Sequence, residues 1–222
     1  MESADLKTEV LVIGAGLSGA ISSQRLAQAG IGVTCLEQGH WNALEAYPGN
    51  KDDFELQAMG SWNANPNIRK GVADYQILDD SSDIKPLLYN GVGGSTVMFS
   101  AHWMRFLPSD FCSYSMDGVG VNWPIGYQDL AAYYLETEFD IGVSGIAGDP
   151  AYPDRPAYPM PPLPIQRWGE RVAEAHHRLD WHWWPGSNAI TSQPYQGRRP
   201  CVQRSTCRAG CNEGAKGSVD QS

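Results

Sequence analysis

The stretch VLVIGAGLSGA, Val10 to Ala20, decides the fold of this chain. Its first four residues continue an apolar, β-branched run over Thr8–Ile13, which is typical of a buried parallel strand. Apolar residues then recur at helical spacing over Leu17–Ala29, and a second buried-strand pattern covers Ile31–Leu36. The sequence therefore predicts a compact strand–helix–strand unit and an α/β fold built on it.

Three glycines connect the first predicted strand to the helix, in the spacing G-x-G-x-x-G. Gly14 permits the tight turn, Gly16 lets the backbone approach a pyrophosphate, and Gly19 lets the helix pack closely on the strand. The phosphates would lie at the helix N-terminus, where unpaired N–H groups favour negative charge. Glu37 ends the second strand 18 positions after Gly19, where a carboxylate can accept hydrogen bonds from ribose hydroxyls and repels a 2′-phosphate. These features predict a dinucleotide site without distinguishing FAD from NAD.

A second glycine-rich loop, NGVGGST, covers Asn90–Thr96. It offers accessible N–H groups and a close approach of the backbone to a ligand. A second loop of this kind fits a larger cofactor such as FAD, whose flavin extends past the pyrophosphate. The simpler alternative is a glycine-rich turn between strands.

The rest of the chain mixes loops with amphipathic segments. Residues 40–85 are rich in Asn, Asp, Gly and Trp, which predicts loops and short elements. Helical spacing predicts helices over Tyr127–Phe139 and Ile165–Leu179, and Trp181–Trp184 is read as a short strand. The prolines between Asp149 and Pro164 exclude a helix and favour an extended surface crossing.

Three cysteines lie close together near the end, as Cys201-x5-Cys207-x3-Cys211. Thiolates on one short loop are typical ligands of iron–sulfur clusters, and three suit a cluster with one vacant corner. A structural zinc site with a fourth ligand from elsewhere, or three unligated thiols, are the alternatives. An odd total of five cysteines without an export signal argues against a disulfide framework.

Composition excludes several classes of protein. A formal net charge of -9 argues against a nucleic-acid partner. No stretch approaches the roughly 20 apolar residues of a membrane-spanning helix, and residues 1–7 carry two acids and lack the apolar core of a signal peptide. We therefore expect a cytoplasmic protein, or one on the periplasmic face of the membrane if a partner carries it there.

Six stretches, in order along the chain, resemble the glucose–methanol–choline (GMC) oxidoreductases. Within that family, the resemblance is to the FAD-dependent sugar and polyol dehydrogenases that carry an iron–sulfur cluster. The stretches are VLVIGAGLSGA with Glu37, YNGVGGSTVMFSAHWMRFLPSDF (Tyr89–Phe111), NWPIGYQDLAAYY (Asn122–Tyr134), IGVSG (Ile141–Gly145), PMPPLP (Pro159–Pro164) and RPCVQRSTCRAGCNEGAKGS (Arg199–Ser218).

The resemblance implies a Rossmann-like FAD-binding domain, present in part, with the start of a substrate domain. The first part of the FAD domain would cover residues 1–120, the start of the substrate domain 121–195, and a cysteine loop returning to the FAD domain 196–222. Gly14, Gly16, Gly19 and Glu37 would hold the ADP half of FAD. The pyrophosphate and flavin would be lined by Asn90, Gly91, Gly93, Gly94, Ser95 and Thr96.

The resemblance also implies how the cofactors are held. Some family members attach FAD covalently through a histidine four residues beyond the Gly-Gly pair, where this chain has Met98. A thioether cannot serve that role, so we expect non-covalent FAD. Cys201, Cys207 and Cys211 match the ligands of a 3Fe-4S cluster.

The implied activity is oxidation of a CH–OH group on a sugar, polyol or related alcohol, with hydride passing to flavin N5. Electrons would leave through the cluster to a cytochrome or quinone, and a small chaperone-like subunit is an expected partner. The family's catalytic histidine lies near the end of a much longer chain, so we assign no catalytic residue and expect an N-terminal fragment. The alternatives are a GMC oxidase or lyase without a cluster, a non-catalytic flavin- or nucleotide-binding module, and an NAD-binding dehydrogenase that shares only the first motif.

Overall fold

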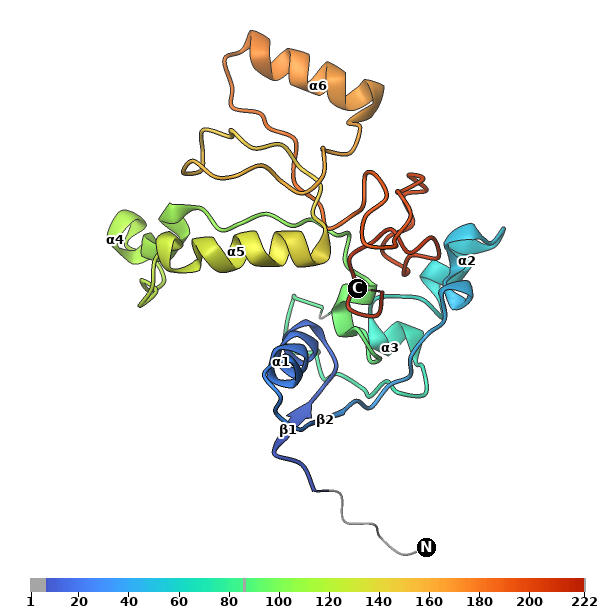
Figure 1. Ribbon diagram of the computed structural model, residues 1–222. Coiled ribbons are helices and arrows are strands. Elements are labelled where there is room, and N and C mark those ends of the chain that lie inside the picture. Colours follow the sequence, from blue (N-terminus) through green and yellow to red (C-terminus); the bar gives the residue numbers. More distant parts are fainter. Residues whose placement is uncertain (1–6, 86, 222) are drawn as a thin grey trace, which may run out of the picture. The chain divides into compact units, whose positions relative to one another are not determined.

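The computed structural model describes residues 7–85 and 87–221. The chain divides into two compact units (Figure 1). The first unit holds the residues up to Ser100 together with the segment from Val202 onward, and the second holds Ala101–Cys201. The functional domains predicted from the sequence, with bounds at residues 120 and 195, follow a different division and stay predictions.

The first unit begins with the predicted strand–helix–strand unit. Strand β1 covers Val10–Ile13, helix α1 Leu17–Gln28 and strand β2 Val33–Leu36. The two strands pair in parallel, with Val10 opposite Val33 and Ile13 opposite Leu36. This part of the prediction is confirmed, and it gives an α/β unit. The larger sheet of a Rossmann-like domain stays a prediction.

The prediction that both strands are buried is wrong. Ile13 is 82% exposed and Leu36 is 51% exposed. Helix α1 packs against both strands, but a parallel sheet is buried only when both of its faces are covered. Because a sheet of two strands also has two open edges, the apolar residues of β1 and β2 remain accessible in this unit.

The rest of the first unit consists of loops and short helices, as predicted for residues 40–85. Tyr47, Val97 and Met98 are buried together, and Trp62, Ala64 and Tyr89 pack against them. This small core lies next to the second glycine loop. The short helices are η1 (Leu44–Ala46), η2 (Pro48–Asn50), α2 (Phe54–Met59), α3 (Pro66–Arg69) and η3 (Gly94–Val97).

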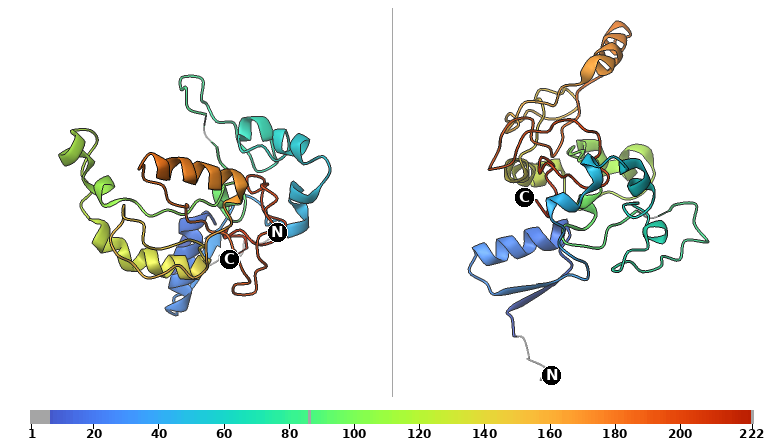
Figure 2. Two further views of the ribbon diagram at one scale, coloured as in Figure 1. Left: turned by 90° about the horizontal axis from the view of Figure 1, so that it is seen from above. Right: turned by 90° about the vertical axis from the view of Figure 1, so that its right-hand side faces the viewer.

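The second unit contains the two longer helices that the periodicity predicts. These are α5 (Tyr127–Ile141), which ends at the left-handed C-cap Gly142, and α6 (Gln166–Arg178). Helix α6 projects from the rest of its unit (Figures 1 and 2), and Trp168 on it is 85% exposed. The shorter helices of this unit are η4 (Pro108–Cys112) and α4 (Ser113–Asp117).

The strand predicted at Trp181–Trp184 is wrong, since these residues have no regular structure. Backbone pairing starts only after Pro185 and Gly186, where Asn188 forms isolated bridges with Ser144 and His102. The Trp184 indole N–H instead donates to the carbonyl of Ile146 at 3.0 Å. A strand needs a neighbouring chain to pair with, and a run of aromatic residues does not supply one.

Candidate functional site

The two glycine loops meet in the first unit. The Gly93 N–H donates to the carbonyl oxygen of Ala15 at 2.8 Å. A Cβ atom placed on Gly94 would lie 2.9 Å from the Cα of Gly16. Because such a contact is too short for any side chain, the two loops approach each other backbone to backbone, and both positions need glycine.

The first loop is shaped by glycines in the way its motif predicts. Gly14 has φ 95°, in the left-handed region that favours glycine, and its N–H donates to Leu36 O at 2.7 Å. A Cβ on Gly19 would lie 1.9 Å from the Gly14 carbonyl oxygen. Gly19 therefore allows helix α1 to begin directly against the turn that follows β1.

The N-terminus of α1 is open to an anion. Its N-cap is Gly16, no side chain caps it, and no acid lies in its first turn. A Cβ on Gly14 would meet nothing within 4 Å, so the space in front of the turn is open. The first N–H groups of a helix and its dipole favour a phosphate at such a position.

Glu37 connects the first loop to the segment that follows β2. Its Oε2 accepts the Ala15 N–H at 2.8 Å, and its Oε1 accepts the Gly39 N–H at 2.9 Å. A carboxylate has about four acceptor sites, so these two bonds leave room for further donors. The structure thus gives Glu37 a clear role in ordering the loop, and the binding of ribose hydroxyls stays a prediction.

The second loop lies directly against residues 38–40. A Cβ on Gly39 would come within 2.4 Å of the Asn90 carbonyl oxygen. The Val92 N–H donates to His40 O at 3.2 Å, and the Gln38 amide donates to Asn90 Oδ1 at 2.8 Å. The segment after β2 therefore contacts both glycine loops and holds them in one place.

A buried ion pair supports Asn90, and sequence reasoning missed it. Asp74 accepts from Arg69 Nε at 2.9 Å and from Asn90 Nδ2 at 3.0 Å, and the side chains of Arg69 and Asp74 are 5% and 6% exposed. Burial favours a higher pKa for Asp74, but hydrogen bonds from Arg69, the Gly71 N–H and Asn90 outweigh it and lower the pKa below 3.8. No local motif marks this pair, because its two residues lie in the loop-rich region.

Replacing Asp74 with asparagine is expected to lower the free energy of unfolding by roughly 2–3 kcal/mol, since it leaves a buried guanidinium without a counter-charge. Because the pKa of Asp74 is lowered in the folded state, its contribution is present above about pH 4 and is lost as the pH falls below it. Urea denaturation at several pH values should therefore show a steeper acid loss in the wild type than in Asp74→Asn. Equal slopes would show that this carboxylate does not carry the effect.

Thr96 supports the second loop from the protein side. Its hydroxyl donates to Gly93 O at 2.5 Å and accepts the Val219 N–H at 3.1 Å. A Cβ on Gly93 would lie 3.1 Å from the backbone nitrogen of Asp220. The loop is therefore backed by residues near the end of the chain, while Ser95 beside it is exposed.

The predicted metal ligands are divided between the two units. Cys207 and Cys211 are half-buried in the first unit, and Cys201 belongs to the second. Among residues 7–85 and 87–221, no three His, Cys, Asp or Glu side chains gather in a way that could hold a metal ion. Metal binding by these cysteines stays a prediction.

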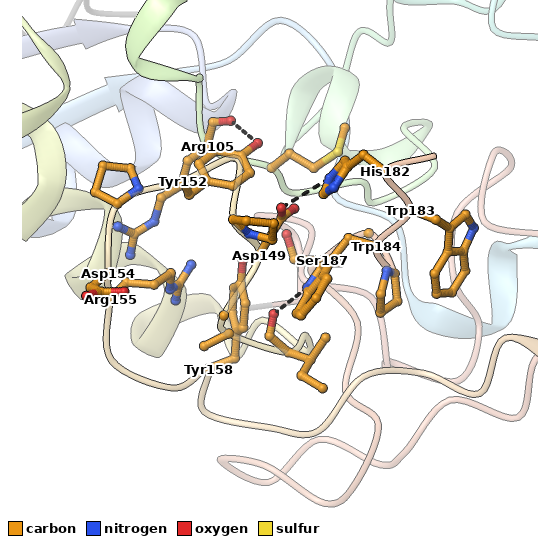
Figure 3. A pocket seen from close by; sticks show the side chains of 18 residues that line it. Arg105, Asp149, Tyr152, Asp154, Arg155, Tyr158, His182, Trp183, Trp184 and Ser187 are labelled. Carbon is orange, nitrogen blue, oxygen red and sulfur yellow. Dashed lines mark hydrogen bonds and ion pairs between the residues drawn. The ribbon is translucent and has the colours of Figure 1, made fainter. Parts of the chain in front are cut away.

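The second unit contains a cavity of about 590 Å³ that no motif predicted (Figure 3). Its wall includes Tyr158, over whose ring the Arg155 guanidinium lies at 3.7 Å, and the His182–Asp149 pair at 3.2 Å. Trp184 also lines it. Aromatic walls with a few converging polar groups are common in sites for small polar molecules.

Comparison with known proteins identifies the chemistry of the first unit. Residues 7–46 match the family described as FAD binding domain. This match contains β1, α1, β2 and Glu37. The predicted dinucleotide site is therefore confirmed as an FAD-binding domain, which argues against the NAD alternative. In the described part of the chain, no helix has the length and apolar character needed to cross a membrane.

Several curated proteins resemble most of this chain. A 2-methyl-1,2-propanediol dehydrogenase of Mycolicibacterium austroafricanum is 42% identical over 200 residues, which cover 88% of this chain and 35% of that protein. The fructose dehydrogenase large subunit of Gluconobacter japonicus is 29% identical over 97% of this chain and 42% of its own length. A 6'''-hydroxyparomomycin C oxidase of Streptomyces lividus is 30% identical over 98% of this chain and 38% of its own length. The chain thus spans between 35% and 42% of the length of these relatives.

Proposed function

We propose that the protein is an FAD-dependent oxidoreductase that acts on a CH–OH group of a sugar, polyol or related alcohol. The observation that carries this proposal is the direct contact between the two glycine loops, Gly93 N–H to Ala15 O, within a unit whose first part is an FAD-binding domain. The relatives are named as dehydrogenases and an oxidase of a diol, a sugar and an aminoglycoside. We place the protein with the GMC oxidoreductases and expect its domain to be Rossmann-like.

The residues of the first unit suit FAD chemically. The uncapped N-terminus of α1 would hold the pyrophosphate, and Glu37, already fixed by two N–H donors, would accept ribose hydroxyls. The second loop would lie along the pyrophosphate and flavin, with Asn90, Gly91, Gly93, Gly94 and Ser95 facing the cofactor and Thr96 holding the loop. Bound FAD supplies the hydride acceptor for the reaction.

The proposed FAD is non-covalent. Met98 stands where some GMC proteins have a flavin-linked histidine, and it is buried with Tyr47 and Val97 in the small core. A thioether in an apolar cluster has no nucleophile to offer the flavin. Acid precipitation of the protein should release all of the flavin into the supernatant, and flavin that stays with the pellet would show a covalent bond.

An iron–sulfur cluster on Cys201, Cys207 and Cys211 is the finer part of the proposal, and its support is the spacing of the three cysteines. Such a one-electron centre would pass electrons from FAD to a cytochrome or quinone. The name of the fructose dehydrogenase relative, a large subunit, favours a small subunit as an additional partner. Analysis of iron and acid-labile sulfide, with Cys211→Ser for comparison, tests this. Zinc, or no metal, in anaerobically purified protein would replace the cluster.

Reduction of the bound flavin tests the catalytic part. Sugars, polyols and small diols are added without oxygen to the flavin-loaded full-length protein, and the flavin absorbance is followed. Bleaching by at least one of these alcohols is expected. A bound flavin that dithionite reduces but no alcohol reduces would favour the non-catalytic flavin-binding module.

A further inference from the structure

A lysine is buried in the first unit where no charge is expected. The Lys216 side chain belongs to a residue that is 1% exposed. Its Nζ donates to three backbone carbonyl oxygens, those of Val97 at 2.6 Å, Cys207 at 2.8 Å and Phe99 at 3.4 Å. An ammonium group has three donors, so all of them are used on the backbone.

These carbonyl groups belong to two segments far apart in the sequence. Val97 is the last residue of η3, which begins at Gly94 in the second glycine loop. Cys207 belongs to the cysteine loop, which we define in this unit as residues 202–211. The ammonium therefore forms a cross-link between the end of the predicted flavin loop and the cysteine loop.

Residues that follow Lys216 contact the same glycine loop. The Val219 N–H donates to the Thr96 hydroxyl, and Asp220 packs against Gly93. Tyr47 in the core donates its phenolic hydrogen to Asp220. The segment 216–220 thus backs the loop at three points, and Lys216 alone also reaches the cysteine loop.

Burying the ammonium is costly, which indicates a specific role. Burial lowers the pKa of Lys216 to about 8, and the nearby Cys207, Cys211 and Asp220 offset part of that effect. The Phe99 ring lies 5.4 Å from Nζ and adds a cation–π contact. An apolar side chain of similar length would avoid the cost of burying a charge but leave three carbonyl groups without a donor.

We propose that Lys216 is a positioning residue whose ammonium group fixes the second glycine loop to the cysteine loop and so holds the FAD-binding loop in its binding-competent shape. The inference rests on the proposed function, in which this loop contacts FAD. Lys216 itself is assigned no contact with substrate or cofactor.

The test compares Lys216→Met, Lys216→Arg and Lys51→Met in the full-length protein. Lys51 is exposed in the same unit and serves as the matched control. FAD affinity is measured by titration, and the rate at which a maleimide labels Cys207 is measured by mass spectrometry. We expect Lys216→Met to bind FAD about tenfold more weakly and to be labelled faster at Cys207. Lys216→Arg, which keeps the charge and donors, should recover part of both.

The two measurements separate failure of the inference from failure of the proposed function. A wild type that binds no FAD refutes the proposed function, and the labelling rates still test the cross-link. A wild type, Lys216→Met and Lys51→Met that share one FAD affinity and one labelling rate refute the inference. If Lys216→Met does not fold, hydrogen exchange of the amides of residues 92–97 in Lys216→Arg decides, since unchanged exchange there would also refute it.

Discussion

FAD affinity should fall by at least about a hundredfold when Gly19 is replaced by alanine. A Cβ at this position would lie 1.9 Å from the Gly14 carbonyl oxygen and 3.3 Å from Val12 Cγ1. The first contact is with backbone, so the start of α1 or the turn itself has to move. Either movement displaces the N–H groups that would hold the pyrophosphate, and two factors of ten correspond to about 2.8 kcal/mol of binding free energy.

Gly186→Ala is the matched control for this prediction. Its new Cβ would meet nothing within 4 Å, and its backbone is outside the left-handed region. FAD titration of the two variants and the wild type, with far-UV circular dichroism to confirm folding, should show a loss only in Gly19→Ala. A folded Gly19→Ala protein with wild-type affinity would mean that the first glycine loop does not hold the cofactor.

Replacing Glu138 with glutamine is expected to cost about 3–5 kcal/mol of unfolding free energy. Glu138 in α5 is 1% exposed and binds two arginines: Arg105 Nε at 2.8 Å and Arg155 Nη1 at 2.9 Å, both on Oε1. Arg105 also donates to the Tyr127 hydroxyl at 3.1 Å. One carboxylate therefore neutralises two largely buried guanidinium groups, and its loss leaves both without a counter-charge.

This network shapes the cavity in the second unit, because Arg105 and Arg155 both line it. Urea denaturation followed by tryptophan fluorescence measures the loss. Glu174→Gln is the control, since Glu174 pairs with Arg171 in an exposed position on α6 and should change stability by less than about 0.5 kcal/mol. If the two glutamine variants were equally stable, the buried network would not contribute to the stability of this unit.

The sequence allowed the local parts of the site to be predicted. The turn after β1, helix α1 and Glu37 follow from short-range rules, in which glycine spacing and apolar periodicity determine the backbone within about 20 residues. The same periodicity predicted α5 and α6. The second glycine loop was recognised as a possible partner of the first, and the contact between Gly93 and Ala15 places it there.

Features that depend on distant residues could not be predicted. Arg69 and Asp74 lie in a region without periodicity, and the Lys216 contacts join residues 119 positions apart. Charged residues are usually exposed, so nothing local marked Lys216 or Glu138 as buried. The exposure of β1 and β2 was misjudged for a related reason, since an apolar strand is buried only when another element covers it.

The most direct test of the central claim is the amount of FAD in the purified full-length protein. Flavin released by acid is quantified against protein, with Gly19→Ala prepared in parallel. We predict one non-covalent FAD per wild-type chain and far less in the variant. A wild type that contains no flavin and takes up none from solution would contradict the claim that the two adjoining glycine loops form an FAD site.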